Sequence, residues 1–314
     1  MKTIRLALLS FATVISSLVA TAQQAPAEAF VASMSGSATV TAPGSTTAVP
    51  LVIGQTLPEG STVTTAEGGS VLIQSHKGME TGLGSKATAV IGSHSVSADG
   101  VRTAVIDLKE GTVVSVLDPS KRATNNYAVR TAKGVAAARG TVYTTTVTLS
   151  SGGQVTVTVN TLTGAVSFAI AGGQTVSVAA GNSANSNSTA STPISTALAG
   201  ANAAEKAELV EAFKLATTVV TIIAVNDQTS DQTNRTALKG TIDTVIADFR
   251  AGGDTALVSS LLAGFAAGIS AGQSATVVTS PDGTVQSISA PAPTTGSTPA
   301  QTIDITIVSP SSTP

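Results

Sequence analysis

Short runs of Val, Ile and Thr, interrupted by Gly, Pro, Asn and Asp, fill the sequence between about residues 35 and 183. Residues branched at Cβ favour strands, whereas Gly favours turns by accepting a positive φ and Pro by presetting φ. The candidate strands are Ser37–Thr41, Thr62–Thr65, Val71–Ser75, Thr88–Ile91, Arg102–Leu108, Thr112–Leu117, Val155–Val159, Leu162–Ile170 and Thr175–Ala179. The candidate turns are Pro43-Gly44, Pro58-Glu59-Gly60, Gly68-Gly69, Asp99-Gly100, Glu110-Gly111, Ser151-Gly152-Gly153 and Gly172-Gly173. This alternation of strand-forming runs and turn residues predicts a mainly β domain of many short strands.

The segment Val155–Val159 has the clearest strand pattern. Its three valines fall on one face and the two threonines between them fall on the other. Such period-two alternation is typical of a half-buried strand. No segment between residues 35 and 183 has a convincing helical period, and this argues against an α/β fold.

Composition limits the classes of function. Charged residues make up 11% of the 314 residues and aromatic residues 3%, with no Trp and no Cys, whereas a typical charged share is about 25%. Binding to nucleic acid requires clustered Lys and Arg that neutralise phosphates. The longest basic run is Lys121-Arg122, which we interpret as a solvated loop. The lack of cysteine excludes disulfides, thiolate metal sites and cysteine nucleophiles. We therefore expect an extracellular protein with a hydroxyl-rich surface and no nucleic-acid partner.

Residues 1–22 have the pattern of a secretory signal peptide. Lys2 and Arg5 provide a positive start, Leu6–Ala20 is apolar and uncharged, and Ala20-Thr21-Ala22 offers a small-x-small cleavage site. The alternative is a membrane anchor, but the apolar run is shorter than the roughly 20 residues that a span requires. We expect an exported protein, periplasmic or extracellular, without a lipidated cysteine.

The β region is organised around the stretch Tyr127–Leu149. We interpret it as two strands joined through a Lys133-Gly134 turn and a small-residue passage that ends at Arg139-Gly140-Thr141. The Arg139 side chain is expected to cross under neighbouring strands and donate to carbonyls or a carboxylate. Gly140 is expected to allow a close approach of backbones. The functional alternative is that Arg139 binds an anion.

This stretch resembles the FecR domain. Residues 129–143 read Val-Arg-Thr-Ala-Lys-Gly-Val-Ala-Ala-Ala-Arg-Gly-Thr-Val-Tyr and are similar to the family signature Val-x-Thr-x-x-Gly-x-x-x-x-Arg-Gly-Thr-x-Phe/Tyr. Residues 36–40, 51–65 and 108–113 resemble the opening strand, the Gly-x-x-Val-x-Thr segment and the Leu-x-x-Gly-x-Val strand of the family. The resemblance covers roughly half the chain. It implies a FecR-like β-sandwich or short β-helix over residues 35–182, with a structural motif and no catalytic residues.

The chain departs from FecR-type sigma-factor regulators in one respect. Those proteins have a cytoplasmic region that binds the sigma factor, followed by one membrane span and a periplasmic sensor. Here a cleavable signal takes the place of the span, so the resemblance implies the extracytoplasmic module alone.

After the β region the sequence changes character. Residues 183–201 are rich in Asn, Ser, Thr and Ala and predict a flexible linker. Residues 202–272 predict a helical region of about three helices, because Asn202 and Glu205 form a capping box and apolar residues then repeat at spacings of three and four. The apolar stripes are Leu209, Phe213, Ala216, Val220 and Ile223; Leu238, Ile242, Val245 and Phe249; and Val258, Leu261, Leu262, Phe265 and Ile269.

Three arrangements are open for the helices: a small bundle, docking on the β domain, or binding to a partner. Thr255–Gln273 carries no charge, but its Ser and Gly residues disfavour a membrane span. Residues 273–289, centred on the Pro281-Asp282-Gly283 turn, predict a β-hairpin. Residues 290–314 predict a Pro/Thr/Ser-rich tail.

Two motifs resemble catalytic or cofactor-binding sequences. Residues 268–272 match the Gly-x-Ser-x-Gly elbow around Ser270. That mechanism needs a preceding strand and a downstream His, whereas here a helix is expected before Ser270 and both histidines lie upstream. Gly82–Ala87 matches a loose dinucleotide fingerprint, but no βαβ unit surrounds it and it predicts a turn.

His76 and His94 are the two histidines of the chain. The nearest acidic residues are Glu80 and Asp99, at spacings that fit no standard zinc site. We expect both histidines in exposed loops. The sequence thus predicts no catalytic, cofactor-binding or metal-ligating residues.

These features predict a non-enzymatic exported FecR-domain protein that acts as a binding or scaffold module at the cell envelope. An envelope protein or a polysaccharide would suit the hydroxyl-rich surface, although the scarcity of aromatics argues against strong sugar stacking. The alternative is an extracytoplasmic sensor or regulatory component of a cell-surface signalling system. A secreted hydrolase is the least favoured alternative.

Overall fold

The computed structural model describes residues 29–150 and 152–226, the isolated positions 247, 258, 259, 263 and 264, and two segments at 276–279 and 285–289. The predicted signal peptide (1–22), the stripe from Leu238 to Phe249, Ser270 and the predicted tail (290–314) lie outside the described residues.

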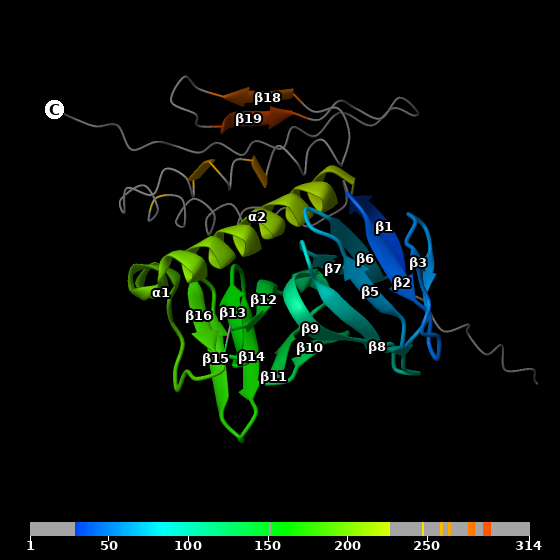
Figure 1. Ribbon diagram of the computed structural model, residues 1–314, viewed down its shortest axis with the longest axis horizontal. Coiled ribbons are helices and arrows are strands. Elements are labelled where there is room, and N and C mark those ends of the chain that lie inside the picture. The colour runs from blue at the N-terminus through cyan, green and yellow to red at the C-terminus, as the bar shows by residue number, and fades with distance from the viewer. Residues whose placement is uncertain are drawn as a thin grey trace, which may run out of the picture.

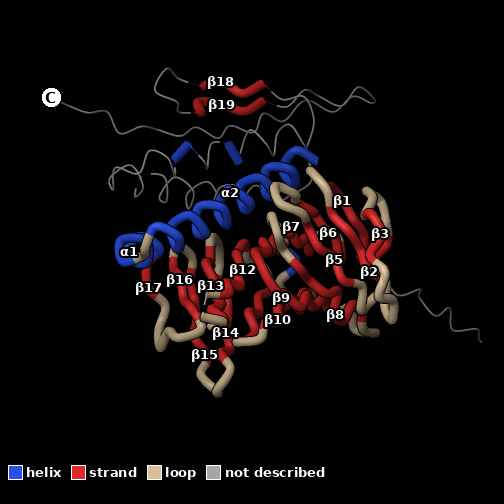
Figure 2. The backbone as a smooth tube through the Cα atoms, viewed as in Figure 1, coloured by secondary structure: helices blue, strands red, loops and turns tan. Residues whose placement is uncertain are grey.

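Seventeen strands in the described part form one hydrogen-bonded network that folds into two layers (Figures 1 and 2). They are β1 (Ala29–Ser35), β2 (Ala38–Thr41), β3 (Ala48–Pro50), β4 (Thr56–Leu57), β5 (Thr62–Thr65), β6 (Ser70–His76), β7 (Met79–Leu83), β8 (Thr88–Val96), β9 (Arg102–Leu117), β10 (Asn125–Thr131), β11 (Gly134–Ala138), β12 (Val142–Leu149), β13 (Val155–Thr161), β14 (Ala165–Ile170), β15 (Thr175–Ala179), β16 (Asn182–Asn185) and β17 (Thr192–Pro193). Sheet A has the order β4-β1-β6-β7-β9-β12-β13-β16-β17. Sheet B has the order β3-β2-β5-β8-β9-β10-β11-β14-β15.

Strand β9 belongs to both sheets. Its first half pairs with β8 and β10 in sheet B, and its second half pairs with β7 and β12 in sheet A. The sequence predicted two strands separated by a turn at Glu110-Gly111; the structure has one strand that bends there. Gly111 has φ +82°, and a Cβ at this position would lie 2.7 Å from the Cα of Ala87. The residue that signalled a turn therefore serves as the corner between the sheets.

A hydrophobic core lies between the two sheets and follows the alternation of the strands. In β13, Val157 and Val159 are fully buried, whereas Thr156 and Thr158 are partly exposed. Larger core side chains come from both layers: Ile73, Leu83 and Leu117 from sheet A, and Ile91, Ile106, Leu108 and Phe168 from sheet B. Of the pairings between described strands, only that of β9 with β10 is parallel. The mainly β prediction is confirmed, and the mostly antiparallel, two-layer arrangement is a sandwich and not a β-helix.

A helical layer covers the outer face of sheet A. Helix α1 (Ile194–Gly200) is followed by helix α2 (Ala203–Asn226), which runs across the strands in Figure 1 and contacts β7, β9 and β12. The two helices and the outer face of sheet A share a second apolar cluster, which includes Leu72, Val114, Phe213 and Val219. Of the three arrangements open for the helical region, docking on the β domain is the one that the structure shows for α2.

The N-terminus of α2 has the predicted capping box. The side-chain oxygen of Asn202 accepts the backbone N–H groups of Ala204 and Glu205 at 3.0 Å each, and the Glu205 carboxylate accepts the N–H of Asn202 at 2.9 Å. The predicted stripe from Leu209 to Ile223 packs in the second apolar cluster, so this helix is confirmed.

Replacing Asn202 by Ala should lower the free energy of unfolding by about 1 kcal/mol, because two N–H groups of the first helical turn lose their acceptor. Urea unfolding followed by circular dichroism measures this loss. The exposed Ala203 provides a matched control, since Ala203→Ser should change the midpoint little. Equal effects of the two substitutions would contradict the capping role.

The segment predicted as a flexible linker, 183–201, carries regular structure instead. Strand β16 pairs with β13, β17 pairs with β16, and α1 begins directly after β17. Ile194 and Leu198, four residues apart on one helix face, are buried in the second apolar cluster. The Ser/Asn/Thr composition suggested a linker, but these two apolar residues at helical spacing anchor the segment.

The sandwich also begins earlier and contains more strands than predicted. Strand β1 begins at Ala29, before the predicted start of the domain at residue 35. Strand β7 has the sequence Met-Glu-Thr-Gly-Leu, which lacks the Val, Ile and Thr runs used to recognise strands. Near the C-terminus, β18 (Thr276–Thr279) and β19 (Val285–Ser289) pair antiparallel, while the predicted turn at residues 281–283 lies outside the described residues. No helix in the described part is both long and apolar enough to cross a membrane.

Candidate functional site

The stretch Tyr127–Leu149 forms three strands where the sequence predicted two. Strands β10 and β11 make a hairpin around Ala132-Lys133, one residue before the predicted Lys133-Gly134 turn, and the small-residue passage is itself strand β11. Ala136 and Ala138 of β11 face the core, while Ala137 is exposed. The passage was not recognised as a strand because alanine is a poor strand former.

Two tyrosines of this stretch are buried side by side in the core. Tyr127 and Tyr143 meet edge to face with ring centroids 6.5 Å apart. The Tyr127 hydroxyl hydrogen-bonds Thr81 Oγ1 at 2.6 Å and accepts from Ser115 Oγ at 3.2 Å, and the Tyr143 hydroxyl donates to the carbonyl of Ala136. Burial raises the pKa of Tyr127 to about 12 and raises that of Tyr143 well above its usual value. Both phenols are therefore neutral packing elements near pH 7.

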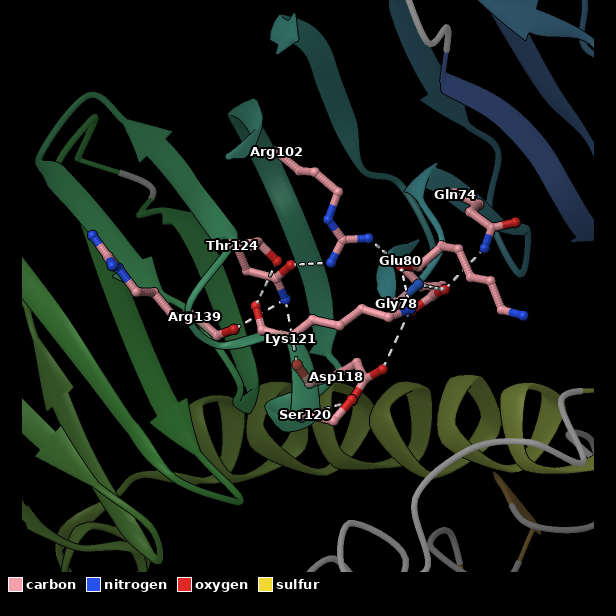
Figure 3. Close-up of polar contacts among 11 residues, drawn as sticks. Gln74, Gly78, Glu80, Arg102, Asp118, Ser120, Lys121, Thr124 and Arg139 are labelled. Atoms are coloured by element: carbon pink, nitrogen blue, oxygen red, sulfur yellow. Dashed lines mark hydrogen bonds and ion pairs between the residues drawn. The ribbon is translucent and has the colours of Figure 1, made fainter. Parts of the chain in front are cut away.

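The residues Arg139-Gly140-Thr141 divide into a packed part and an exposed part. A Cβ on Gly140 would lie 2.6 Å from Pro119 Cα, which confirms the expected close approach. Thr141 is buried and donates to the carbonyl of Ala165 at 3.1 Å. The expectation that the Arg139 side chain crosses under the strands is wrong: the side chain is exposed and points away from the polar contacts in Figure 3. Only its backbone carbonyl takes part, by accepting from Asn125 Nδ2 at 3.0 Å.

A polar network holds the turn between β6 and β7 against the segment after β9 (Figure 3). The carbonyl of Lys77 accepts from Arg102 Nη1 at 2.6 Å and from Lys121 Nζ at 3.0 Å. Lys121 also pairs with Asp118 at 3.4 Å. On the other side of the turn, the buried Glu80 carboxylate accepts the N–H of Gly78 at 2.9 Å. These side chains are bonded to neighbouring backbone and polar groups, so the network fixes the turn.

His76 and His94 do not lie in exposed loops, contrary to the prediction. They lie at the end of β6 and within β8, are 7% and 6% exposed, and stack with ring centroids 4.3 Å apart and planes 10° from parallel. Each follows an irregularity in strand register, between Gln74 and His76 and between Ile91 and His94. A β-bulge changes the direction of the side chains that follow it. Counting alternate residues from the start of β6 or β8 therefore assigns these histidines to the wrong face of the sheet.

The Gly82–Gly84 part of the loose dinucleotide motif seats helix α2 on sheet A. Gly82 lies in β7, not in a turn, and a Cβ there would lie 2.3 Å from Cγ2 of Val219. A Cβ on Gly84 would lie 3.0 Å from Cδ2 of Leu215. The two glycines let the helix approach the sheet closely. The motif therefore has a packing role.

Beside the contact of α2 with Gly82 and Gly84, a groove of about 1020 Å³ opens between α2 and sheet A. Its sheet side is formed by the ends of β1, β6 and β12, the turns at 68–69 and 84–86, and residues 110–112 of β9. Its helix side is the face of α2 from Ala207 to Ile222. The groove combines segments from six distant parts of the chain, and no local sequence pattern predicted it.

The groove has an apolar floor and a charged rim. The buried lining residues include Leu72, Leu215, Val219 and Ile222. The exposed charged residues of the lining are Lys86, Glu110, Glu208 and Glu211. Hydroxyl groups of Ser and Thr on β1, β6 and β12 line the space between. An apolar floor with sparse polar groups is the usual composition of a binding site.

Lys86 on this rim has an unusual backbone conformation. Its φ of +53° is the only positive φ of a non-glycine residue in the described part of the chain. Its side chain pairs with Glu67 at 3.2 Å, with both groups largely exposed, and such a pair contributes little to stability. Backbone strain of this kind costs on the order of 1–3 kcal/mol and clusters at functional sites, so it marks this rim as the candidate functional region.

Comparison with known proteins shows no family. No family model matches the chain, and no curated protein matches it in sequence. Two crystal structures of a candidate anti-sigma factor from Parabacteroides distasonis ATCC 8503 are similar to it, each with a TM-score of 0.32 and 12% sequence identity. Each match covers 40% of this chain and 53% of that chain. The chain therefore spans about half the length of that protein.

Proposed function

We propose that the chain is a non-enzymatic, exported FecR-domain protein that acts as a binding or scaffold module at the cell envelope. The observation that carries this proposal is the groove between α2 and sheet A, which would be the binding site. Its apolar floor and charged rim suit recognition through burial and charge pairing.

The FecR-like signature supports a structural role for the residues that it contains. Val129 and Tyr143 are buried in the core, Gly140 packs on Pro119, and Thr141 bonds a carbonyl of the next hairpin. These side chains build the sandwich that positions the groove, which is what a family of binding modules on a common β scaffold would require.

A polypeptide segment suits the groove better than a polysaccharide. The groove's volume of about 1020 Å³ is at the upper end of the range for small-ligand pockets. None of its described lining residues is aromatic, so the groove has no ring on which a sugar could stack. Apolar side chains of a peptide would contact the floor formed by Leu215 and Val219, and a basic residue would pair with Glu208 on the rim, since Glu211 already pairs with Lys214 at 3.5 Å. We propose a peptide segment of an envelope protein as the partner.

Site-specific photo-crosslinking tests this proposal. A photoreactive amino acid at Ala207, an exposed groove residue of α2, should give a discrete adduct with an envelope protein when intact cells are irradiated. The same group at Ala137, exposed on the outer face of sheet B, provides the control and should give no such adduct.

A groove-filling substitution makes the test specific. Glu211→Trp places a large ring on the rim, and it should reduce the Ala207 adduct at least tenfold while Ala137→Trp leaves it unchanged. Equal adducts from both label positions, or an adduct that survives Glu211→Trp, would contradict binding in the groove. A membrane receptor as the captured protein would favour the sensor alternative, and retention of the mature protein on cell-wall polysaccharide without any adduct would favour glycan binding.

A further inference from the structure

The histidine pair joins the two sheets by reciprocal hydrogen bonds. His76 is on β6 in sheet A, and its Nε2 lies 3.2 Å from the carbonyl oxygen of Thr103 in the sheet B half of β9. His94 is on β8 in sheet B, and its Nε2 lies 2.6 Å from the carbonyl oxygen of Ser75 in sheet A. Each ring therefore reaches from its own layer to the backbone of the other.

The hydrogen bonds define the protonation state of the closed arrangement. A carbonyl oxygen only accepts, so Nε2 of each ring must carry the proton and donate it. Both rings can then be neutral, with Nδ1 unprotonated. Protonation at Nδ1 would create two buried cations with centroids 4.3 Å apart, and like charges at this separation repel strongly when water is excluded.

No carboxylate is among the groups that raise the pKa of His76. Arg102, on β9 beside His76, adds a third positive charge. Glu59 lies before β5, where its carboxylate accepts the backbone N–H of His94, and it is solvent-exposed. On the adjoining turns, the Glu80 carboxylate accepts the N–H of Gly78, and Asp118 pairs with Lys121. Lys77 is exposed and enters the network of Figure 3 through its backbone carbonyl.

We infer that the His76–His94 pair is a pH-sensitive clasp between sheets A and B, closed while the His76 ring is neutral and opened when acidification protonates it. The clasp sits where β6, β8 and β9 meet, so its opening would loosen this end of the sandwich. Such a device would let an exported protein respond to acid outside the cytoplasm. The inference depends on the two rings and is independent of what the groove binds.

The direction of the pH effect follows from linkage. Burial, then the charge of His94, lowers the pKa of His76 in the folded protein, and the carbonyls of Thr103 and Ser95 oppose the shift only in part. The unfolded chain has the ordinary value near 6.5. Between the two values the unfolded state binds more protons, so stability is fully present above about pH 6.5 and falls as the pH drops toward the folded-state pKa. Each unit by which the pKa of His76 is lowered in the folded protein corresponds to about a tenfold loss in the ratio of folded to unfolded protein at low pH.

The test is urea unfolding of the full-length protein at pH 7.5 and pH 5.5. The chain has two histidines, so the double variant His76→Gln/His94→Gln removes all imidazole titration while keeping an amide donor at each position. The wild-type midpoint should fall between the two pH values, and the double variant should lose most of this dependence because the carboxylates titrate alike in both proteins. A wild-type midpoint that is the same at both pH values, or a dependence that the double variant retains, would overturn the inference.

Imidazole NMR of the wild-type protein provides a second readout that does not require the variant to fold. The His76 ring should show the neutral form with the proton on Nε2, and should remain neutral at pH 6, where an exposed histidine is mostly protonated. Hydrogen exchange of residues 74–79 and 93–97, corrected for the intrinsic rate, should accelerate on acidification. A His76 ring that titrates near pH 6.5, or a proton on Nδ1 in the neutral ring, would rule out the clasp.

Discussion

Replacing Gly111 by Ala should lower the free energy of unfolding by about 2–5 kcal/mol, because two independent costs add at this corner. A non-glycine residue in the left-handed region costs about 1–2 kcal/mol, and Gly111 has φ +82°. A Cβ would also lie 2.7 Å from Ala87 Cα and 3.0 Å from the Lys86 carbonyl. These are backbone atoms that cannot move aside singly, and overpacking of this kind costs about 1–3 kcal/mol.

Gly100 offers a control that isolates the steric cost. It has nearly the same φ, +81°, but a Cβ added there would have no atom within 4 Å and would face open space. Gly100→Ala should therefore cost only about 1–2 kcal/mol. Urea unfolding of the two variants under one condition measures the difference. If Gly111→Ala costs no more than Gly100→Ala, β9 does not bend tightly against Ala87 and the corner between the sheets is misplaced.

Replacing Gly82 by Ala should displace helix α2 from sheet A and cost about 1–3 kcal/mol. The new methyl group would meet Cγ2 of Val219 at 2.3 Å, and Val219 is a buried, β-branched residue with little rotamer freedom. The core between the two sheets does not include Val219. We therefore expect the sandwich to persist while α2 becomes more accessible to protease.

A double-mutant cycle separates this effect from a general loss of stability. Val219→Ala alone removes about two buried methyl groups and should cost about 1.6 kcal/mol. In combination with Gly82→Ala it creates room for the new methyl group, so the double variant should be at least about 1 kcal/mol more stable than the sum of the single effects predicts. Strictly additive costs would show that the helix does not rest on Gly82.

Signals that depend on neighbours in sequence predicted the structure well. The alternation in Val155–Val159 places its valines in the core, and the Asn202–Glu205 pair begins α2 as predicted. Both signals are local, because a strand alternates with period two and a cap bonds within one helical turn. The mainly β class followed from many such local signals taken together.

Features that depend on distant parts of the chain were missed. Glu110-Gly111 has the composition of a turn, and only the pairing of β9 with strands of both sheets makes it a bend. His76 and His94 are buried because bulges reverse the facing of the residues after them, and a bulge is set by the partner strand. The groove likewise has no counterpart in the sequence, since β1, β6, β12 and α2 meet only after folding.

Arg139 shows the limit of reasoning from a motif. The pattern Arg-Gly-Thr suggested that the arginine was the important residue, yet its side chain is exposed while Gly140 and Thr141 pack. A buried arginine would have needed partners for five N–H donors, and small alanines in β11 supply only backbone groups. The motif in this chain acts through its smallest residues.

Disulfide trapping of α2 on β7 is the most direct test of the close contact between Gly82 and Val219, beside which the groove lies. The chain contains no cysteine, and a Cβ on Gly82 would lie 3.5 Å from Cβ of Val219, within the separation of about 3.5–4.5 Å that a disulfide requires. The Gly82→Cys/Val219→Cys variant should close one intramolecular disulfide under mild oxidation and lose both free thiols. The control Gly82→Cys/Thr217→Cys, whose second cysteine lies on the helix face toward Gly264, should not. Free thiols that persist in the first variant, or equal closure in both, would contradict the placement of α2 and the groove built on it.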